Sequence, residues 1–320
     1  MDYLLIIGGL ALLFAGGEAL VRGSVAISER LGISAILIGV VVVGFGTSTP
    51  ELMVSIKASL AGQPDIALGN VVGSNIANVL LILGISAIIC PVICDAKAIR
   101  RDALAVSGVS VLLFALTFTG SISAITGAIM IALLIIYIIY SYKSEMRDKK
   151  ALKATAPDTV HEHEAQEFSN KLGLGVSLLM SVVGIIMLVL GADFLVEGAS
   201  NIARQAGIPE AVIGLTLVAV GTSLPELATA ISAAVKKNSD VIIGNVLGSN
   251  LFNILSILGI TAIIKPVPLG GQIASFDVPL NLGIALLALL IIYFVRRISR
   301  LTGAVFLVSY VIYIVWLYTS

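Results

Sequence analysis

Two short boxes carry carboxylates and hydroxyls at matching places in the chain. The sequence GTSTPE at 46–51 returns as GTSLPE at 221–226, which is 175 residues further on. A second pair of boxes, GNVVGSN at 69–75 and GNVLGSN at 244–250, keeps the same offset. From 46 to 92 the two copies share 26 of 47 aligned positions without a gap. Agreement of this length indicates an internal duplication rather than a chance likeness between apolar segments.

Each glutamate box can present oxygen ligands on one face of a helix. Glu51 follows Thr47 by four residues, so the carboxylate and the hydroxyl share a face if the segment is helical. Pro50 lacks an N–H and clashes with the carbonyl of Gly46, which is thereby released, and Pro225 acts likewise in the second copy. The candidate oxygen ligands of the two copies are Thr47, Ser48, Glu51, Asn70, Ser74 and Asn78 with Thr222, Ser223, Glu226, Asn245, Ser249 and Asn253.

This ligand set predicts a hard cation. The set contains neither His nor Cys, so Ca²⁺ or Na⁺ fits it better than a soft transition metal. Two carboxylates brought together inside a membrane repel each other, and such a site takes up a proton or another cation. Glu51 and Glu226 balance one Ca²⁺ or two monovalent ions. The same cavity can therefore hold either load but not both, which is the minimum requirement for antiport.

The composition shows which kind of element must position these groups. Of 320 residues, 58% are hydrophobic and 12% are charged, with 19 basic and 19 acidic side chains and a mean hydropathy of +1.09. These values exclude a water-soluble globule, a disordered chain and a nucleic-acid binder, which needs a basic surface. The expected fold class is an all-α membrane protein in contact with membrane lipid, with ten transmembrane helices. The predicted spans are 3–27, 34–60, 65–89, 103–119, 122–142, 174–200, 209–235, 240–264, 275–295 and 301–319.

A polar stretch divides the ten spans into two groups of five. We expect a first five-helix repeat at 1–142, a linker loop at 143–172 and a second five-helix repeat at 173–320. The run from His161 to Glu164 in this linker could hold a metal, but a charge-mixed loop is the preferred interpretation. Because each half has an odd number of spans, the second copy must cross in the opposite direction. Inverted-topology repeats are typical of secondary transporters, whose sites lie at the midplane where the copies meet.

The distribution of Lys and Arg predicts the orientation in the membrane. Sixteen of the 19 basic residues fall on the side of the 143–172 loop, and three, Lys57, Arg204 and Lys265, fall on the other. An excess of positive charge marks the cytoplasmic side. We therefore expect a multi-pass protein of the cell membrane, with the 143–172 loop in the cytoplasm and both termini outside.

Other polar residues have open interpretations. Asn70 and Asn245 either support the ligands or make hydrogen bonds between helices. Glu18 and Asp193 form a second acidic pair with the same offset, for which a structural or gating role is preferred to direct ligation. The two cysteines are too few for a disulfide framework and are expected to be inert.

At these motifs the chain resembles the Na⁺/Ca²⁺ exchangers of the cation/Ca²⁺ antiporter superfamily, in the prokaryotic form with a short linker. The resemblance covers essentially the whole chain and rests on the paired Gly-Thr-Ser-x-Pro-Glu boxes. It implies that Ca²⁺ and Na⁺ are transported substrates, that no cofactor is needed and that the protein is not an enzyme. The ion ligands that the resemblance implies are Glu51, Glu226, Thr47, Ser48, Thr222, Ser223, Ser74, Ser249, Asn78 and Asn253, with the backbone carbonyls of Gly44 and Ala219.

The resemblance also implies a mechanism. Spans one and six slide across the other eight and open each side of the membrane in turn. Some relatives carry Asp at the position of Asn253, and this Asp is associated with K⁺ dependence, so Asn253 favours K⁺-independent exchange. The stoichiometry that the family suggests, three Na⁺ for one Ca²⁺, moves one net charge per cycle and couples transport to the membrane voltage.

Three other functions remain alternatives. H⁺/Ca²⁺ antiport would use Glu51 and Glu226 as proton carriers, although proton-coupled relatives share a Gly-Asn-x-x-Glu box that differs from the box found here. A passive cation channel would conduct without a counter-gradient. An intramembrane enzyme would need a nucleophile, a base or a catalytic metal, and no His lies within any predicted span.

Overall fold

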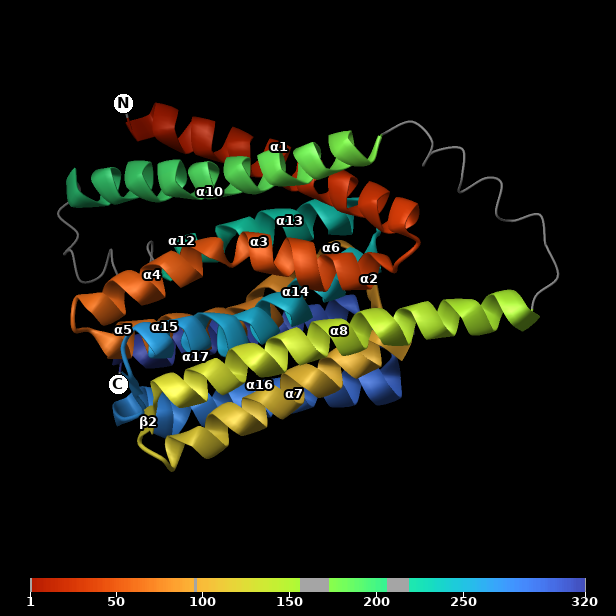
Figure 1. The fold of residues 1–320 in the computed structure, drawn as a ribbon. Coiled ribbons are helices and arrows are strands. Elements are labelled where there is room, and N and C mark those ends of the chain that lie inside the picture. Colours follow the sequence, from red (N-terminus) through yellow and green to blue (C-terminus); the bar gives the residue numbers. More distant parts are fainter. Residues whose placement is uncertain (1, 95–96, 156–172, 206–218, 320) are drawn as a thin grey trace.

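The computed structural model describes the chain except for residues 1, 95–96, 156–172, 206–218 and 320, and Figure 1 shows a bundle of helices. Short π-helical segments, labelled η, interrupt several helices. The elements of the first half are α1 (Asp2–Leu31), α2 (Ala35–Ile38), η1 (Gly39–Gly44), α3 (Phe45–Thr47), α4 (Thr49–Leu60), α5 (Pro64–Ala77), η2 (Asn78–Ile82), α6 (Leu83–Ile89), β1 (Val92–Ile93), α7 (Lys97–Thr117), β2 (Ser121–Ile122) and α8 (Ala124–Thr155). Those of the second half are α10 (Leu174–Gln205), α12 (Ala219–Thr222), α13 (Leu224–Val235), α14 (Ser239–Phe252), η4 (Asn253–Leu258), α15 (Gly259–Ile264), β3 (Val267–Pro268), η5 (Ile273–Asp277), α16 (Val278–Leu290), η6 (Ile291–Val295), β4 (Arg297–Ile298) and α17 (Arg300–Thr319).

The helices are long and apolar, as expected for a membrane protein. Seven helices in the described ranges are long and apolar enough to cross a membrane, or eight if the bent pair Ala35–Thr47 and Thr49–Leu60 is one span. α7 begins with several charged residues and α13 has 12 residues, so neither belongs to this group. Residues 209–218 of the predicted span 209–235 lie outside the described residues. The prediction of a helical, multi-pass membrane protein is confirmed at this level.

Helix α8 extends into the segment that the sequence predicts to be a linker loop. It continues from Ala124 to Thr155, so the first part of the expected loop at 143–172 is helical. Residues 143–155 include four Lys and two Ala together with Glu, Arg, Met and Leu, which favour helix even where no apolar face directs the fold. The remaining part of the linker, with the run from His161 to Glu164, lies outside the described residues.

The first helices of the two halves, α1 and α10, lie side by side along one edge of the bundle (Figure 1). Their backbones approach closely at glycines. A Cβ added to Gly9 would lie 2.7 Å from the carbonyl oxygen of Gly191, and one added to Gly16 would lie 2.9 Å from that of Gly184. Small residues allow helices to associate in lipid, where no hydrophobic driving force brings them together. Both contacts therefore depend on the absence of side chains.

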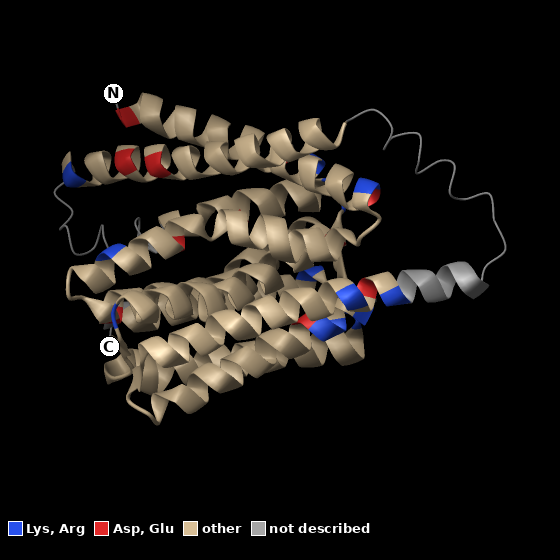
Figure 2. Ribbon diagram, viewed as in Figure 1, with Lys and Arg blue, Asp and Glu red and all other residues tan. Residues whose placement is uncertain are grey.

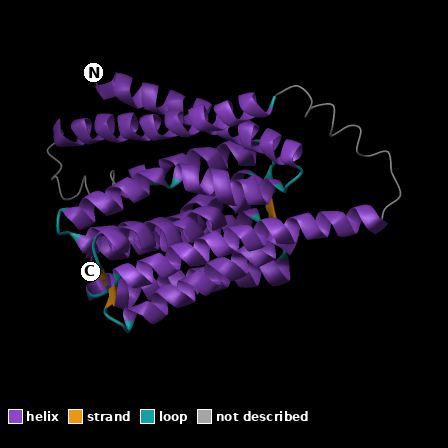
Figure 3. Cartoon of the chain, in the orientation of Figure 1, coloured by secondary structure: helices purple, strands orange, loops and turns teal. Residues whose placement is uncertain are grey.

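Two short antiparallel strand pairs connect the halves, and Figure 3 shows how little else is not helical. Val92 of β1 pairs with Ile298 of β4, while Ile122 of β2 pairs with Val267 of β3. Val92 and Val267 are 175 residues apart, which is the offset of the sequence boxes. Each pair thus joins one half of the chain to the other, and corresponding segments are used in both.

Basic residues gather at one end of the bundle. Figure 2 draws most of the Lys and Arg positions near the end where α8 extends beyond the neighbouring helices. Lys57, Arg204 and Lys265, the three that sequence analysis assigned to the other side, belong to α4, α10 and the segment after α15.

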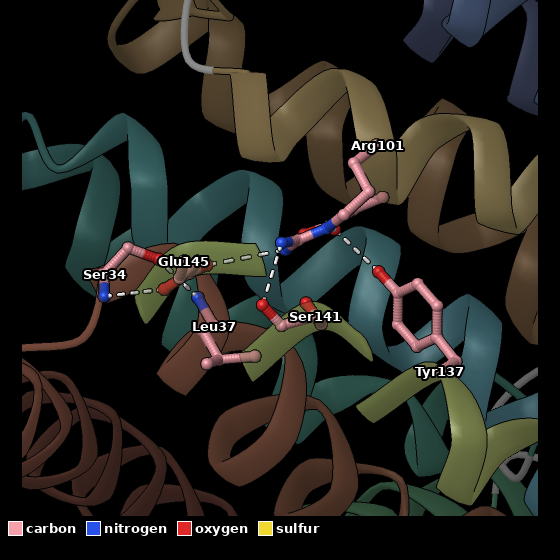
Figure 4. Close-up of polar contacts among 7 residues, drawn as sticks. Ser34, Leu37, Arg101, Tyr137, Ser141 and Glu145 are labelled. Atoms are coloured by element: carbon pink, nitrogen blue, oxygen red, sulfur yellow. Dashed lines mark hydrogen bonds and ion pairs between the residues drawn. The ribbon is translucent and has the colours of Figure 1, made fainter. Parts of the chain in front are cut away.

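A buried polar network at this end links α7 and α8 to the beginning of α2 (Figure 4). Glu145 accepts hydrogen bonds from the backbone N and the Oγ of Ser34, at 3.0 and 2.8 Å. Arg101 lies 3.4 Å from Glu145 and donates to Asp102 at 2.7 Å, and Tyr137 donates to the same aspartate at 2.6 Å. The side chain of Asp102 is almost fully buried, so its charge depends on these partners.

The second half contains a simpler version of the same arrangement. Asp277, 175 residues after Asp102, accepts a hydrogen bond from Tyr313 at 2.9 Å. Phe276 occupies the place that corresponds to Arg101 and packs against Trp316, with the ring centroids 4.0 Å apart. The arginine and its contacts with Glu145 are therefore a feature of the first half.

Both cysteines are free, and they lie at the connection around β1. Cys94 is buried, and desolvation raises the pKa of its thiol to about 12. The thiolate is the reactive form, so Cys94 stays protonated and unreactive at neutral pH. Cys90 is only partly buried and lies just before Pro91.

Replacing Arg101 tests the network. R101M leaves the carboxylate of Asp102 buried without its cation, and we expect it to lower the free energy of unfolding by about 3 kcal/mol. The double variant R101M/D102N removes both charges and is expected to recover most of this loss. Unfolding in detergent, followed by heat or denaturant, measures both values. R297M, at an exposed arginine of β4, is the matched control. A double variant as unstable as R101M alone would contradict the assignment.

Candidate cation site

Both glutamate boxes lie where a helix is broken. The helix axis turns by 44° between Ala35–Thr47 and Thr49–Leu60, and Ser48 at the break has φ −82° and ψ 10°. Ser223 has nearly the same conformation between α12 and α13, with φ −89° and ψ 5°. A proline follows each serine by two residues and cannot continue the preceding ladder of hydrogen bonds. The sequence therefore breaks both helices at the residues that precede the carboxylates.

The two breaks face each other, and each holds the carboxylate of the other. Ser48 Oγ donates to Glu226 Oε1 at 3.1 Å, and Ser223 Oγ donates to Glu51 Oε1 at 3.3 Å. Both glutamates are 1% exposed. Residues that are far apart in the sequence thus form one buried cluster, as the duplicated boxes predict.

The second pair of boxes adds hydroxyls to this cluster. Ser249 Oγ lies 3.5 Å from Glu226 Oε1, and Ser74 Oγ lies 3.4 Å from Ser223 Oγ. Ser249 comes from α14 and Ser74 from α5, so four helical segments contribute to the site. All of these side chains are buried.

Four buried oxygen atoms in the predicted ligand set have no hydrogen-bond donor within the described part of the chain. They are Oε2 of Glu51, Oε2 of Glu226, Oδ1 of Asn78 and Oδ1 of Asn253. No ion pair of the described residues involves either glutamate. A buried acceptor without a partner is costly, and a buried charge without one is more so. Cations bound beside these atoms would supply the missing partners, and oxygen atoms of this kind are the ligands that Ca²⁺ and Na⁺ prefer.

Asn70 and Asn245 combine the two interpretations that the sequence leaves open. Asn70 Nδ2 donates to the backbone carbonyl of Glu51 at 3.0 Å, and Asn245 Nδ2 donates to that of Glu226 at 3.1 Å. Each amide connects two helices and at the same time fixes the backbone of a glutamate. The nitrogens of both amides thus hold the backbone of the two glutamates in place, while Asn245 Oδ1 lies 3.4 Å from Thr47 Oγ1.

The four remaining predicted ligands belong to the helical segments just before the two breaks. Thr47 Oγ1 donates to the carbonyl of Val43 at 3.0 Å and is buried. Gly44 packs so closely on α14 that an added Cβ would lie 2.8 Å from the backbone nitrogen of Ser249. Thr222 ends α12, which begins at Ala219, whose side chain is not described.

Two site residues were missed by the sequence analysis. Asn75 and Asn250 are both 1% exposed, and they accept hydrogen bonds from the amides of Asn253 and Asn78, respectively. The signal was present, because both asparagines end the duplicated GNVxGSN boxes and keep the offset of 175 residues. Spacing alone does not show to which atoms a buried amide is bonded.

The second acidic pair lies apart from these groups. Glu18 of α1 accepts from Lys236 Nζ at 2.8 Å and from Ser232 Oγ at 3.1 Å, and it pairs with Arg22 on its own helix. Asp193 of α10 is exposed and makes no ion pair with any described residue. The preference for a structural or gating role over ligation agrees with the contacts of Glu18.

A membrane-embedded bundle with two broken helices and a buried oxygen cluster is the architecture of an ion-transporting membrane protein. The family model for "Sodium/calcium exchanger protein" matches residues 1–143 and 176–319, and the chain belongs to this family. The sodium/calcium exchanger MaX1 of Methanosarcina acetivorans is 32% identical over 99% of both chains. The inner membrane protein YrbG of Escherichia coli is 32% identical over 82% of this chain and 79% of its own.

Solved structures show the same fold. A structure of the sodium-calcium exchanger NCX_Mj soaked with Na⁺ and Sr²⁺ has a TM-score of 0.84 at 32% identity, covering 98% of this chain and 97% of its own. The family model, MaX1 and NCX_Mj are all described as exchangers, and none of them as an enzyme. The resemblance that the paired boxes carry is therefore confirmed at the level of family and fold.

Neutralising either central carboxylate tests the site. E51Q or E226Q removes one negative charge, so we expect Ca²⁺ affinity to fall at least about tenfold, a loss of about 1.4 kcal/mol. Without ions the same change removes a buried, unpaired charge and is expected to leave the melting temperature unchanged or higher. The rise in melting temperature on adding Ca²⁺ measures binding in detergent. E29Q, at an exposed glutamate of α1, is the control. A full Ca²⁺ response in both variants would remove the carboxylates from the site.

Proposed function

We propose that this protein is a Na⁺/Ca²⁺ antiporter that works by alternating access. The observation that carries the proposal is the set of four unpartnered buried oxygens, two of which belong to carboxylates. We propose that the site consists of the residues that the resemblance implies, with Glu51 and Glu226 as ligands that Ca²⁺ and Na⁺ share. Shared ligands make the two loads mutually exclusive, and that exclusion is the basis of exchange.

The charges of the site lead to proposals on voltage and K⁺. With both glutamates ionised, one Ca²⁺ leaves the site neutral, whereas three Na⁺ leave it with one positive charge. The cycle then moves one net charge, worth about 2.3 kcal/mol per 100 mV. Asn253 is fully buried and uncharged, so the site lacks a third carboxylate that could take another cation. We therefore propose electrogenic exchange that does not need K⁺.

We propose a topology of ten transmembrane helices in two inverted repeats, at 1–142 and 173–320. An odd number of spans in each half, joined by a linker at 143–172, is the basis for this proposal. The strand pairs and the glycine contacts of α1 and α10, which relate corresponding residues of the two halves, support it. The gathering of basic residues at one end supports a cytoplasmic linker and external termini in the cell membrane (Figure 2).

The contacts of α1 and α10 support a sliding movement of this pair. α1 packs along α13, and a Cβ on Gly17 would lie 3.0 Å from the carbonyl oxygen of Ala228. Across the described residues, α10 makes no comparable packing against α4, which corresponds to α13 in the other repeat. The α1–α10 pair therefore packs on the α13 side of the site, and the ion pair of Glu18 with Lys236 adds to this contact. We propose that this is the state with its cytoplasmic side closed.

H⁺/Ca²⁺ antiport is the second candidate. It is supported by the absence of a basic partner for the two glutamates among the described residues. A buried, unpaired carboxylate can take a proton as well as a metal ion. The hydroxyls of Ser48 and Ser223 favour Na⁺, because they offer oxygens that replace the water of a metal ion, which a proton does not need.

Flux through liposomes tests the function. We expect ⁴⁵Ca²⁺ uptake to require an outward Na⁺ gradient, to persist when choline replaces K⁺, and to speed up with an inside-positive voltage. The sign of the voltage effect follows from three Na⁺ leaving for one Ca²⁺ entering. A pH gradient and no gradient are the controls. Uptake driven by the pH gradient alone would replace Na⁺ by H⁺ in the proposal, and uptake with no counter-gradient would indicate a channel.

Removing the Glu18–Lys236 contact tests the conformational proposal. K236M weakens the packing of α1 on α13, so the state closed on the Lys236 side loses population. We expect apparent Ca²⁺ affinity measured from that side to rise about two- to fivefold, with a smaller decrease from the opposite side. Sided flux in inside-out and right-side-out vesicles measures the two values. K237M alters the adjacent exposed lysine and is expected to change neither. Equal affinities in K236M and K237M would argue against a role of the Glu18–Lys236 contact in closing this side.

A further inference from the structure

Two asparagines bind each other across the interface between the repeats. Asn75 Nδ2 donates to the backbone carbonyl of Asn250, and Asn250 Nδ2 donates to that of Asn75, both at 3.3 Å. The two residues come from the ends of α5 and α14 and are fully enclosed. Their amide nitrogens are thus committed to the opposite backbone. We call this pair the amide clasp.

The oxygen atoms of the clasp hold the two asparagines of the candidate site. Asn253 Nδ2 donates to Asn75 Oδ1 at 3.0 Å, and Asn78 Nδ2 donates to Asn250 Oδ1 at 2.9 Å. The clasp residue of each repeat therefore binds the site asparagine of the other. This leaves Oδ1 of Asn78 and Oδ1 of Asn253 as the unpartnered atoms described above.

The direction of these amides decides whether the site attracts a cation. An asparagine amide has an oxygen on one side and an NH₂ group on the other, with almost the same shape, and only its hydrogen bonds select the orientation. Because the nitrogen of Asn75 is bound to a carbonyl, its oxygen must face Asn253. Only a nitrogen can meet that oxygen favourably, so the oxygen of Asn253 is left free. A reversed amide would present a donor to the metal ion and repel it.

We propose that Asn75 and Asn250 are positioning residues that fix the side-chain orientation of Asn253 and Asn78 for cation binding. The inference rests on the proposed function and adds two residues to the binding machinery that do not touch the ion. It also explains why both residues are duplicated. A site assembled from two repeats needs an orienting contact for each amide, and crossing these contacts makes each half depend on the other.

The clasp also restricts which residue can occupy position 253. An aspartate there would place an oxygen against Asn75 Oδ1, so two acceptors would face each other. The same aspartate would not need orienting, because both of its terminal atoms are oxygens. Removing the acceptor at position 75 should therefore lower Ca²⁺ affinity when position 253 is asparagine. It should raise Ca²⁺ affinity when position 253 is aspartate.

A double-mutant cycle on purified full-length protein tests this reversal. N75L keeps the branched shape and the number of heavy atoms of the side chain but removes the acceptor, and we expect it to lower Ca²⁺ affinity about tenfold. We compare the factor by which N253D changes Ca²⁺ affinity in the two backgrounds. This factor is expected to be at least about ten times more favourable in N75L than in the wild type, which corresponds to a coupling of about 1.4 kcal/mol. Titration calorimetry with CaCl₂ in detergent measures the four affinities. A role in packing alone predicts the same factor in both backgrounds.

Controls separate failure of the clasp from failure of the function. N281L changes a buried asparagine of α16 that forms no hydrogen bond with any of the four residues in the described structure, and its cycle with N253D is expected to be additive. If N75L does not fold, the cycle of N250L with N78D examines the other half of the clasp. Ca²⁺ binding by the wild type with an additive N75L cycle would overturn the clasp alone. A wild-type protein that binds no Ca²⁺ would overturn the proposed function and the clasp with it.

Discussion

The structure depends on two carboxylates that are buried together without a basic side chain among the described residues to neutralise them. Such an arrangement is unfavourable in any solvent, and most of all inside a membrane. The surrounding elements make it tolerable by supplying hydroxyl donors from the opposite repeat, Ser48 to Glu226 and Ser223 to Glu51. One oxygen of each carboxylate is thereby satisfied and the other is not. In the proposed function a cation supplies the partner that the second oxygen lacks, and this need connects the fold to ion transport.

Duplication provides this arrangement with few residues. One box places a serine, a proline and a glutamate at a helix break, and its copy places the same three groups opposite. Crossed contacts then recur throughout the molecule, in the serine–glutamate pairs, the amide clasp, the strand pairs and the glycines of α1 and α10. These contacts tie the two halves to each other, and they agree with the proposal that α1 and α10 move as a pair against the remainder.

Much of the site could be predicted from the sequence, because repetition identifies costly residues that packing does not explain. Glu51, Glu226 and the serines were found in this way. The orientation of the buried amides could not be predicted, since it is decided by hydrogen bonds between α5 and α14, which are distant in sequence. The network of Arg101 was missed for a related reason: its partners Glu145 and Ser34 come from elements that only the fold brings together. The extension of α8 to Thr155 shows that a charged linker can be helical when its residues favour helix.

The differences between the halves matter as much as the likeness. Glu18 is held by Lys236, whereas Asp193, its counterpart, is exposed and has no ion pair among the described residues. If the repeats were related by perfect symmetry, both sides would be equally open or equally closed, and ions would either leak or remain trapped. In the proposed alternating-access cycle the two states are unequal, and the two repeats exchange their conformations between them. Among the described residues α1 packs more extensively on α13 than α10 does on α4, and this inequality is what the proposed cycle requires of either state.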